Sequence, residues 1–99
     1  MEENIFVRLD EKVTDKRISK EIFNNHLKYI ENLQETKLLM AVGFEDKDGG
    51  MVVLKAANYA EAIELCSNDP IIKQGFYKFK LYNWDIKYKS NIEEVFSSG

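Results

Sequence analysis

The spacing of apolar side chains predicts that the chain begins with a strand followed by a helix. Residues 4–9 alternate with a period of two, as expected for a strand. The two faces of this strand carry Ile5, Val7 and Leu9 on one side and Phe6 and Arg8 on the other. The charged stretch 10–17 lacks that alternation and is expected to be a loop. From Ser19, a candidate N-cap, helical spacing continues to about Gln34.

Two nearly continuous apolar runs follow, at residues 37–44 and 51–57. Each has the length of a strand, and Gly49 and Gly50 between them suit a tight turn. The pattern therefore predicts an antiparallel hairpin with both of its faces covered.

The last third of the chain predicts a second helix and a final strand. Asn58 is a candidate N-cap, and the run Asn68-Asp69-Pro70 ends the helix, because the residue before a proline avoids helical geometry. The expected buried stripe of this helix is Tyr59, Ala62, Ile63 and Cys66. Residues 71–75 are expected to form a short connector, and 76–86 the final strand. The two faces of that strand carry Tyr77, Phe79 and Leu81 on one side and Phe76, Tyr82, Trp84 and Ile86 on the other.

The order βαββαβ predicts an α+β, ferredoxin-like fold, with a four-stranded antiparallel sheet and two helices on one face. Residues 1–89 are expected to form one domain, and 90–99 a tail that holds one helical turn at 91–96. Two helices cover one face of the sheet, yet both faces are apolar. We therefore expect a second copy of the chain to cover the other face, giving a symmetric homodimer.

Composition narrows the function classes. The 99 residues carry a net charge of −3, which does not fit a nucleic-acid-binding surface. A single cysteine, Cys66, excludes an internal disulfide framework and fits a reducing compartment. No signal peptide and no apolar run of about 20 residues is present, so a cytoplasmic location without membrane contact is expected. One histidine among scattered acidic residues does not offer the ligand spacing of a metal site, and no cofactor is expected.

His26 is the only histidine and lies on the apolar side of the first predicted helix, close to Ile22, Phe23, Ile30 and Leu33 on the helical wheel. A histidine in this position is either a hydrogen-bonded core residue or a group that transfers protons. No serine or cysteine is placed as a nucleophile, so the chemistry open to it is proton transfer.

Several short motifs resemble the YCII-related (YciI-like) family. They are His26-Leu27, Leu38-Leu39-Met40-Ala41, Gly49-Gly50, Asn68-Asp69-Pro70 and Gly75, within a resemblance that covers roughly residues 4–87. The resemblance implies a dimeric α+β barrel and a catalytic pair that corresponds to His26 and Asp69. Some members are thought to act as lyases or dehydrochlorinases on small cyclic compounds. Relatives often carry a basic residue three places before the histidine, where this chain has Phe23.

Two functions remain open at this point. The first is a small lyase or isomerase that uses His26 and Asp69 as a general acid–base pair on a small cyclic or polar metabolite. The second is a non-catalytic module that binds a small ligand or serves as a structural dimer. On its own, Asp69 before Pro70 is also an ordinary helix-ending residue.

Overall fold

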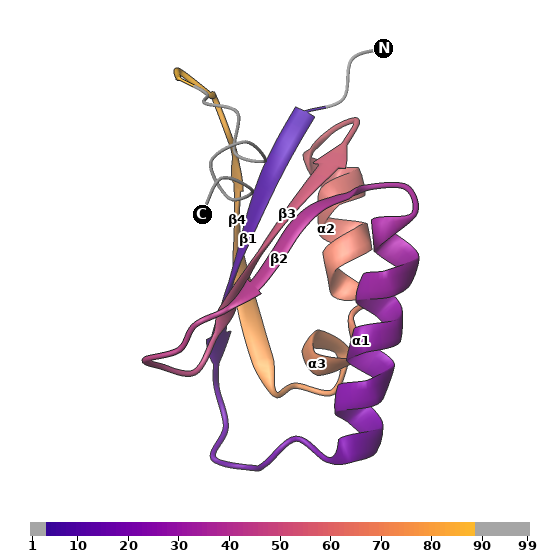
Figure 1. Ribbon diagram of the computed structural model, residues 1–99, viewed down its shortest axis with the longest axis vertical. Coiled ribbons are helices and arrows are strands. Elements are labelled where there is room, and N and C mark those ends of the chain that lie inside the picture. The colour runs from indigo at the N-terminus through magenta and orange to yellow at the C-terminus, as the bar shows by residue number, and fades with distance from the viewer. Residues whose placement is uncertain (1–3, 89–99) are drawn as a thin grey trace, which may run out of the picture.

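The structure, a computed structural model, describes residues 4–88 (Figure 1). Its elements are β1 (Asn4–Lys12), α1 (Lys20–Gln34), β2 (Leu38–Gly43), β3 (Gly50–Ala56), α2 (Tyr59–Ser67), α3 (Pro70–Lys73) and β4 (Tyr77–Asn83). The predicted order βαββαβ is confirmed, with the short helix α3 added. The expected helical turn at 91–96 lies outside the described residues, and the domain boundary at residue 89 stays a prediction.

The four strands form one antiparallel sheet in the order β2-β3-β1-β4. This is the ferredoxin-like arrangement predicted from the sequence. β1 lies between β3 and β4, so Arg8 is opposite Val52 on one side and Leu81 on the other. A residue on a central strand is covered by both neighbouring strands, and β1 and β3 are the two central strands of this sheet.

The strand β1 is longer than predicted. The expectation of a loop from residue 10 is wrong, because Asp10, Glu11 and Lys12 pair with residues 77–79 of β4. The charged side chains of residues 10–12 lack the apolar alternation of a strand, although their backbone remains paired with β4. As a result, Asp10 extends from the same face as Phe6 and Arg8, since alternate residues of a strand share a face.

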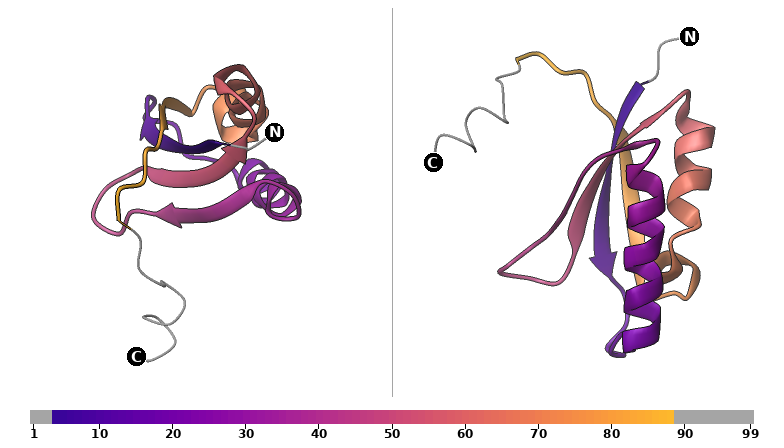
Figure 2. Two further views of the ribbon diagram at one scale, coloured as in Figure 1. Left: turned by 90° about the horizontal axis from the view of Figure 1, so that it is seen from above. Right: turned by 45° about the vertical axis from the view of Figure 1, so that its right-hand side comes forward.

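Both long helices pack on one face of the sheet, with α3 beside them (Figures 1 and 2). The core between these layers consists of Phe6, Leu33, Val52, Leu54, Ala56, Ala62, Cys66 and Leu81. Asn58 caps α2 as predicted, since its side-chain oxygen accepts a hydrogen bond from the backbone N–H of Glu61 at 2.9 Å.

The predicted stripe of α2 is only half correct. Ala62 and Cys66 are fully buried, but Tyr59 and Ile63 are partly exposed. These two residues lie at the flank of the helix beside β4, where they line a groove with Tyr82. Tyr59 still contributes to the core through an edge-to-face contact with Phe6 and a hydrogen bond to the carbonyl of Leu81.

The face of the sheet opposite the helices carries two rows of mainly apolar side chains. Strand register places Met40, Val53, Val7 and Tyr82 in one row and Val42, Met51, Leu9 and Lys80 in the next. We call these eight residues the open sheet face. The expectation that both faces of the hairpin are covered is wrong for β2 in a single chain, because β2 is an edge strand and most of its residues are exposed.

The turn before β3 depends on two glycines. Gly49 has a φ of 129°, and a Cβ at this position would lie 2.6 Å from the carbonyl oxygen of Asp10. A Cβ at Gly50 would lie 2.6 Å from the carbonyl oxygen of Val42. Both glycines thus let the hairpin approach neighbouring backbone more closely than a side chain permits.

We predict that Gly49→Ala lowers the free energy of unfolding by about 1–3 kcal/mol, because it adds backbone strain and a clash with Asp10. Gly43→Ala is the matched control, since a Cβ there meets no atom within 4 Å and φ is not positive. Thermal or urea denaturation measures both variants. Equal stabilities for the two variants would contradict the assigned turn geometry.

Candidate functional site

His26 is placed by α1, which begins at the N-cap Ser19. The Ser19 hydroxyl accepts a hydrogen bond from the backbone N–H of Ile22 at 3.1 Å. Leu33 is buried further along the helix and anchors it on the sheet. The His26 side chain is 17% exposed, so it lies at the border between core and solvent, as expected for the apolar side of this helix. Phe23 differs from the prediction because it is about half exposed.

Asp69 lies between α2 and α3 and is fully buried. The predicted connector after it instead contains α3, and Asp69 is the N-cap of that helix. Its carboxylate accepts a hydrogen bond from the backbone N–H of Ile71 at 3.1 Å. Pro70 follows at the first helical position, where a missing N–H costs nothing.

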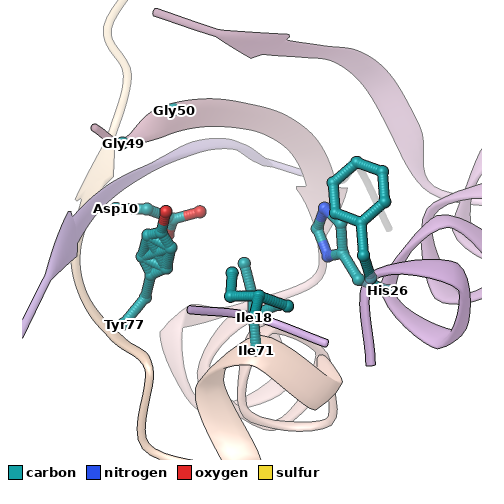
Figure 3. A pocket seen from close by; sticks show the side chains of 8 residues that line it. Asp10, Ile18, His26, Gly49, Gly50, Ile71 and Tyr77 are labelled. Carbon is teal, nitrogen blue, oxygen red and sulfur yellow. The ribbon is translucent and has the colours of Figure 1, made fainter. Parts of the chain in front are cut away.

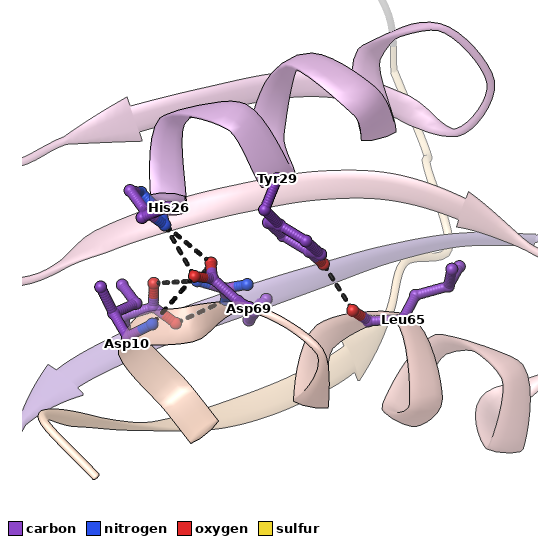
Figure 4. A network of polar contacts seen from close by, with 7 residues as sticks. Asp10, His26, Tyr29, Leu65 and Asp69 are labelled. Carbon is purple, nitrogen blue, oxygen red and sulfur yellow. Dashed lines mark hydrogen bonds and ion pairs between the residues drawn. The ribbon is translucent and has the colours of Figure 1, made fainter. Parts of the chain in front are cut away.

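The two residues meet. His26 Nδ1 lies 2.8 Å from Oδ1 and 2.9 Å from Oδ2 of Asp69 (Figure 4). A carboxylate only accepts hydrogen bonds, so the Nδ1 proton belongs to the imidazole and Nε2 carries the free lone pair of the neutral ring. The predicted approach of His26 and Asp69 is confirmed, and Nε2 is the ring nitrogen left for a bound molecule.

A third residue, Arg8, completes the cluster and was not singled out from the sequence. Its Nη2 donates to Asp69 Oδ2 at 2.9 Å. Its Nε and Nη2 also donate to the two carboxylate oxygens of Asp10, each at 2.7 Å. Arg8 is fully buried, yet both acids next to it balance its charge. Burial alone would lower the pKa of the Arg8 guanidinium, but Asp10 and then Asp69 outweigh it and hold this pKa above its ordinary value.

These contacts form one continuous chain from Asp10 through Arg8 and Asp69 to His26. With a neutral imidazole the four side chains carry one net negative charge, and with a protonated imidazole they carry none. When His26 takes up a proton, the carboxylate of Asp69 therefore balances the new positive charge, as in the histidine–aspartate half of a catalytic triad.

Cys66 lies beside this cluster but is not equipped as a nucleophile. Burial raises the pKa of its thiol to about 11, although the positive charge of Arg8 acts in the opposite direction. The thiol therefore stays protonated at neutral pH, in agreement with the expectation of an inert core cysteine.

A small pocket of about 140 Å³ opens beside His26. It is lined by Asp10, Ile18, Phe23, His26, Gly49, Gly50, Ile71 and Tyr77. Figure 3 shows Asp10 and Tyr77 on one side of the pocket and His26 on the other, with Ile18 and Ile71 between them. The sequence predicts only a turn at Gly49 and Gly50, but in the structure both glycines also form part of the pocket wall.

The walls offer few polar groups. The Tyr77 hydroxyl stays protonated at neutral pH, because burial, followed by the charges of Asp48 and Asp10, raises the pKa of Tyr77. Phe23 packs near the imidazole, with ring centroids 6.1 Å apart. An aromatic ring thus lies beside the imidazole at this end of the pocket. Within residues 4–88, no three histidine, cysteine, aspartate or glutamate side chains are grouped so that they could hold a metal ion.

Comparison with known proteins identifies a family and a similar fold. Residues 4–84 match the model of the YCII-related domain. The chain is 29% identical over 72 residues to the uncharacterized protein YjpA of Bacillus subtilis, a match that covers 72% of this chain and 85% of YjpA. No helix among the described residues is long and apolar enough to cross a membrane.

The fold is similar to a solved structure, the 5-chloro-2-hydroxyhydroquinone dehydrochlorinase TftG of Burkholderia phenoliruptrix AC1100, in complex with 2,5-dihydroxybenzoquinone. The TM-score is 0.67 at 22% sequence identity, and the match covers 82% of this chain and 93% of TftG. At this identity the likeness concerns the fold.

Proposed function

The chain belongs to the YCII-related domain family, and from this premise we propose that it is a small enzyme of the lyase or isomerase type. In this proposal His26 transfers a proton to or from a small cyclic metabolite, and Asp69 orients the imidazole. The observation that carries the proposal is the Nδ1 contact with Asp69 at 2.8 Å, which leaves Nε2 for a molecule in the adjoining pocket.

The chemistry follows from the protonation states. Neutral His26 accepts a proton at Nε2 from a carbon or oxygen acid of the bound molecule. The resulting imidazolium is stabilised by Asp69, which is itself held by Arg8 and by the backbone of Ile71. Returning the proton to a different atom gives an isomerisation, and loss of a leaving group after proton removal gives an elimination. Among the residues that the structure describes, no serine, threonine, cysteine or lysine lines the pocket, which favours proton transfer over covalent catalysis.

The size of the pocket supports a ligand of about one ring. A cavity of about 150 Å³ with apolar walls accommodates benzene in a well-studied protein, and the pocket beside His26 has a volume of about 140 Å³. The dehydrochlorinase of similar fold was solved with a single-ring quinone, which is consistent with this range of ligands.

We expect His26→Gln and Asp69→Asn each to lower kcat by about 10²–10⁴-fold, because general acid–base groups contribute rate factors of this size. The matched control is Lys28→Gln, an exposed position on the same helix, which should leave kcat unchanged. The assay follows single-ring substrates, such as chlorinated hydroquinones, by ultraviolet absorbance and chloride release.

Turnover that survives in His26→Gln would exclude the proposed role of the imidazole. Saturable ligand binding without turnover by the wild-type protein would instead favour the non-catalytic binding module. Circular dichroism of each variant separates loss of rate from loss of fold, which matters for Asp69 because it is a buried partner of Arg8.

We further propose that the protein is a homodimer formed through the open sheet face. Leu9, Met40, Val42 and Tyr82 are each at least 37% exposed on this face, although they are apolar or aromatic. Strand register places them in two adjacent rows on the same face of the sheet. A second copy is the occupant that buries this patch symmetrically, and the family resemblance to dimeric α+β barrels supports it.

Sedimentation at micromolar concentration should therefore give about twice the 11.6 kDa mass of the chain. Val42→Asp should dissociate the dimer, since it would bury a charge among the apolar side chains of the interface, where strand register places Met51 beside it. Leu27→Asp is the control, because Leu27 is similarly exposed but lies on α1. A wild-type protein that sediments as a monomer, or a Val42→Asp variant that stays dimeric, would contradict this interface.

A further inference from the structure

Asp10 is a charged group on the pocket wall that the proton transfer itself does not use. Its side chain is 7% exposed, and it lies across the pocket from His26 (Figure 3). Both of its oxygens accept hydrogen bonds from Arg8, so the group is held as a carboxylate in one orientation. A carboxylate has about four lone-pair sites, and the fork from Arg8 uses two of them.

The wall opposite His26 therefore accepts hydrogen bonds. Within residues 4–88, no lysine or arginine lines the pocket, and Arg8, the partner of Asp10, is fully buried. Tyr77 adds a hydroxyl beside the carboxylate, and its proton is retained at neutral pH. Phe23, beside the imidazole, adds only an aromatic surface.

We infer that Asp10 determines specificity and that the pocket takes a neutral single ring whose hydroxyl or N–H group donates a hydrogen bond to Asp10. A ligand that places a carboxylate or phosphate at this end meets a fixed like charge and is rejected. This inference deepens the proposed function, since it takes the pocket beside His26 as the ligand site. It assigns Asp10 and Tyr77 to binding and leaves proton transfer to His26 and Asp69.

The backbone geometry explains why Asp10, Arg8 and the turn at Gly49 lie at the same end of the pocket. Asp10 and Arg8 are two residues apart on β1, so their side chains extend from the same face of the strand. The close approach of Gly49 to the Asp10 carbonyl brings the hairpin turn against this end of the pocket. A ring between Ile18 and Ile71 would thus have one edge toward His26 and the other toward Asp10 (Figure 3).

A pair of nearly isosteric probes tests the inference. Benzamide is neutral and carries N–H donors, whereas benzoate has the same shape but is an anion that only accepts hydrogen bonds. Each is titrated into the full-length protein at pH 7, and the ring signals of His26 and Tyr77 are followed by NMR. We expect benzamide to saturate both signals and benzoate to bind at least about tenfold more weakly, because two like charges a few ångströms apart repel in a partly buried site.

Asp10→Asn removes the charge with little change of shape, and it should reduce the preference for benzamide to within about threefold. Tyr77→Phe keeps the charge of Asp10, so this variant should bind both probes more weakly or equally but retain the preference. If Asp10→Asn does not fold, the relative affinity of the wild type for benzamide and benzoate still tests the inference, and Tyr77→Phe shows whether the preference depends on the tyrosine hydroxyl. Benzoate binding as tight as that of benzamide, a preference unchanged in folded Asp10→Asn, or no saturable binding of either probe would overturn the inference.

The same titration with His26→Gln separates this inference from the proposed function. Benzamide should still be preferred there, because the discrimination arises at Asp10 rather than at the imidazole. If benzamide is still preferred but His26→Gln turns over substrate as fast as the wild type, only the catalytic role of His26 is refuted. If the wild type binds benzamide and benzoate equally well but His26→Gln loses turnover, only the role of Asp10 is refuted.

Discussion

The guanidinium of Arg8 has no contact with solvent, and the arrangement of the site depends on how its charge is compensated. An isolated buried charge is too costly to tolerate, so Arg8 must be paired with acidic groups, which reach its Nε and Nη2 but not its Nη1. Asp10, on the same strand, accepts two hydrogen bonds from Arg8, and Asp69, 61 positions along the chain, accepts one. The need to pair one cation thus ties β1 to the junction of α2 and α3. Removing a single partner from such a cluster typically lowers the free energy of unfolding by about 3–5 kcal/mol. The cluster therefore stabilises the fold as well as orienting His26.

The consequence for His26 is a fixed orientation. Asp69 is held from three directions by Arg8, by the backbone of Ile71 and by the imidazole itself. It cannot rotate away to solvent, so the imidazole it holds presents the same nitrogen to the pocket. The glycine turn acts on the opposite wall in a similar way, since its contact with the Asp10 backbone leaves no room for a side chain. A rigid sheet and a close-packed turn therefore place polar groups on both sides of an otherwise apolar pocket.

The sequence predicts the fold well because the fold depends on periodicity. Strand and helix spacing gave all four strands and both long helices, and the two cap residues Ser19 and Asn58 lie where the pattern placed them. The pair of His26 and Asp69 came from the family resemblance, since residues 43 positions apart in the chain carry no local signal of contact. Arg8 was missed because a charged residue on a short strand reads as solvent-facing. The available signal was Phe6, whose apolar ring shares a face with Arg8 and lies in the core. The extension of β1 through Asp10 was missed for a related reason, because pairing with β4 is a long-range property.

The central claim is that Asp69 holds the neutral imidazole with its proton on Nδ1, so that Nε2 is the base that faces the pocket. Long-range ¹H–¹⁵N correlation NMR of the ring of His26, the only histidine in the chain, measures this directly at a pH where the imidazole is neutral. The account predicts that Nδ1 has the shift of a protonated nitrogen and Nε2 that of an unprotonated one. A predominant Nε2–H tautomer, or an averaged signal from both tautomers, would contradict it.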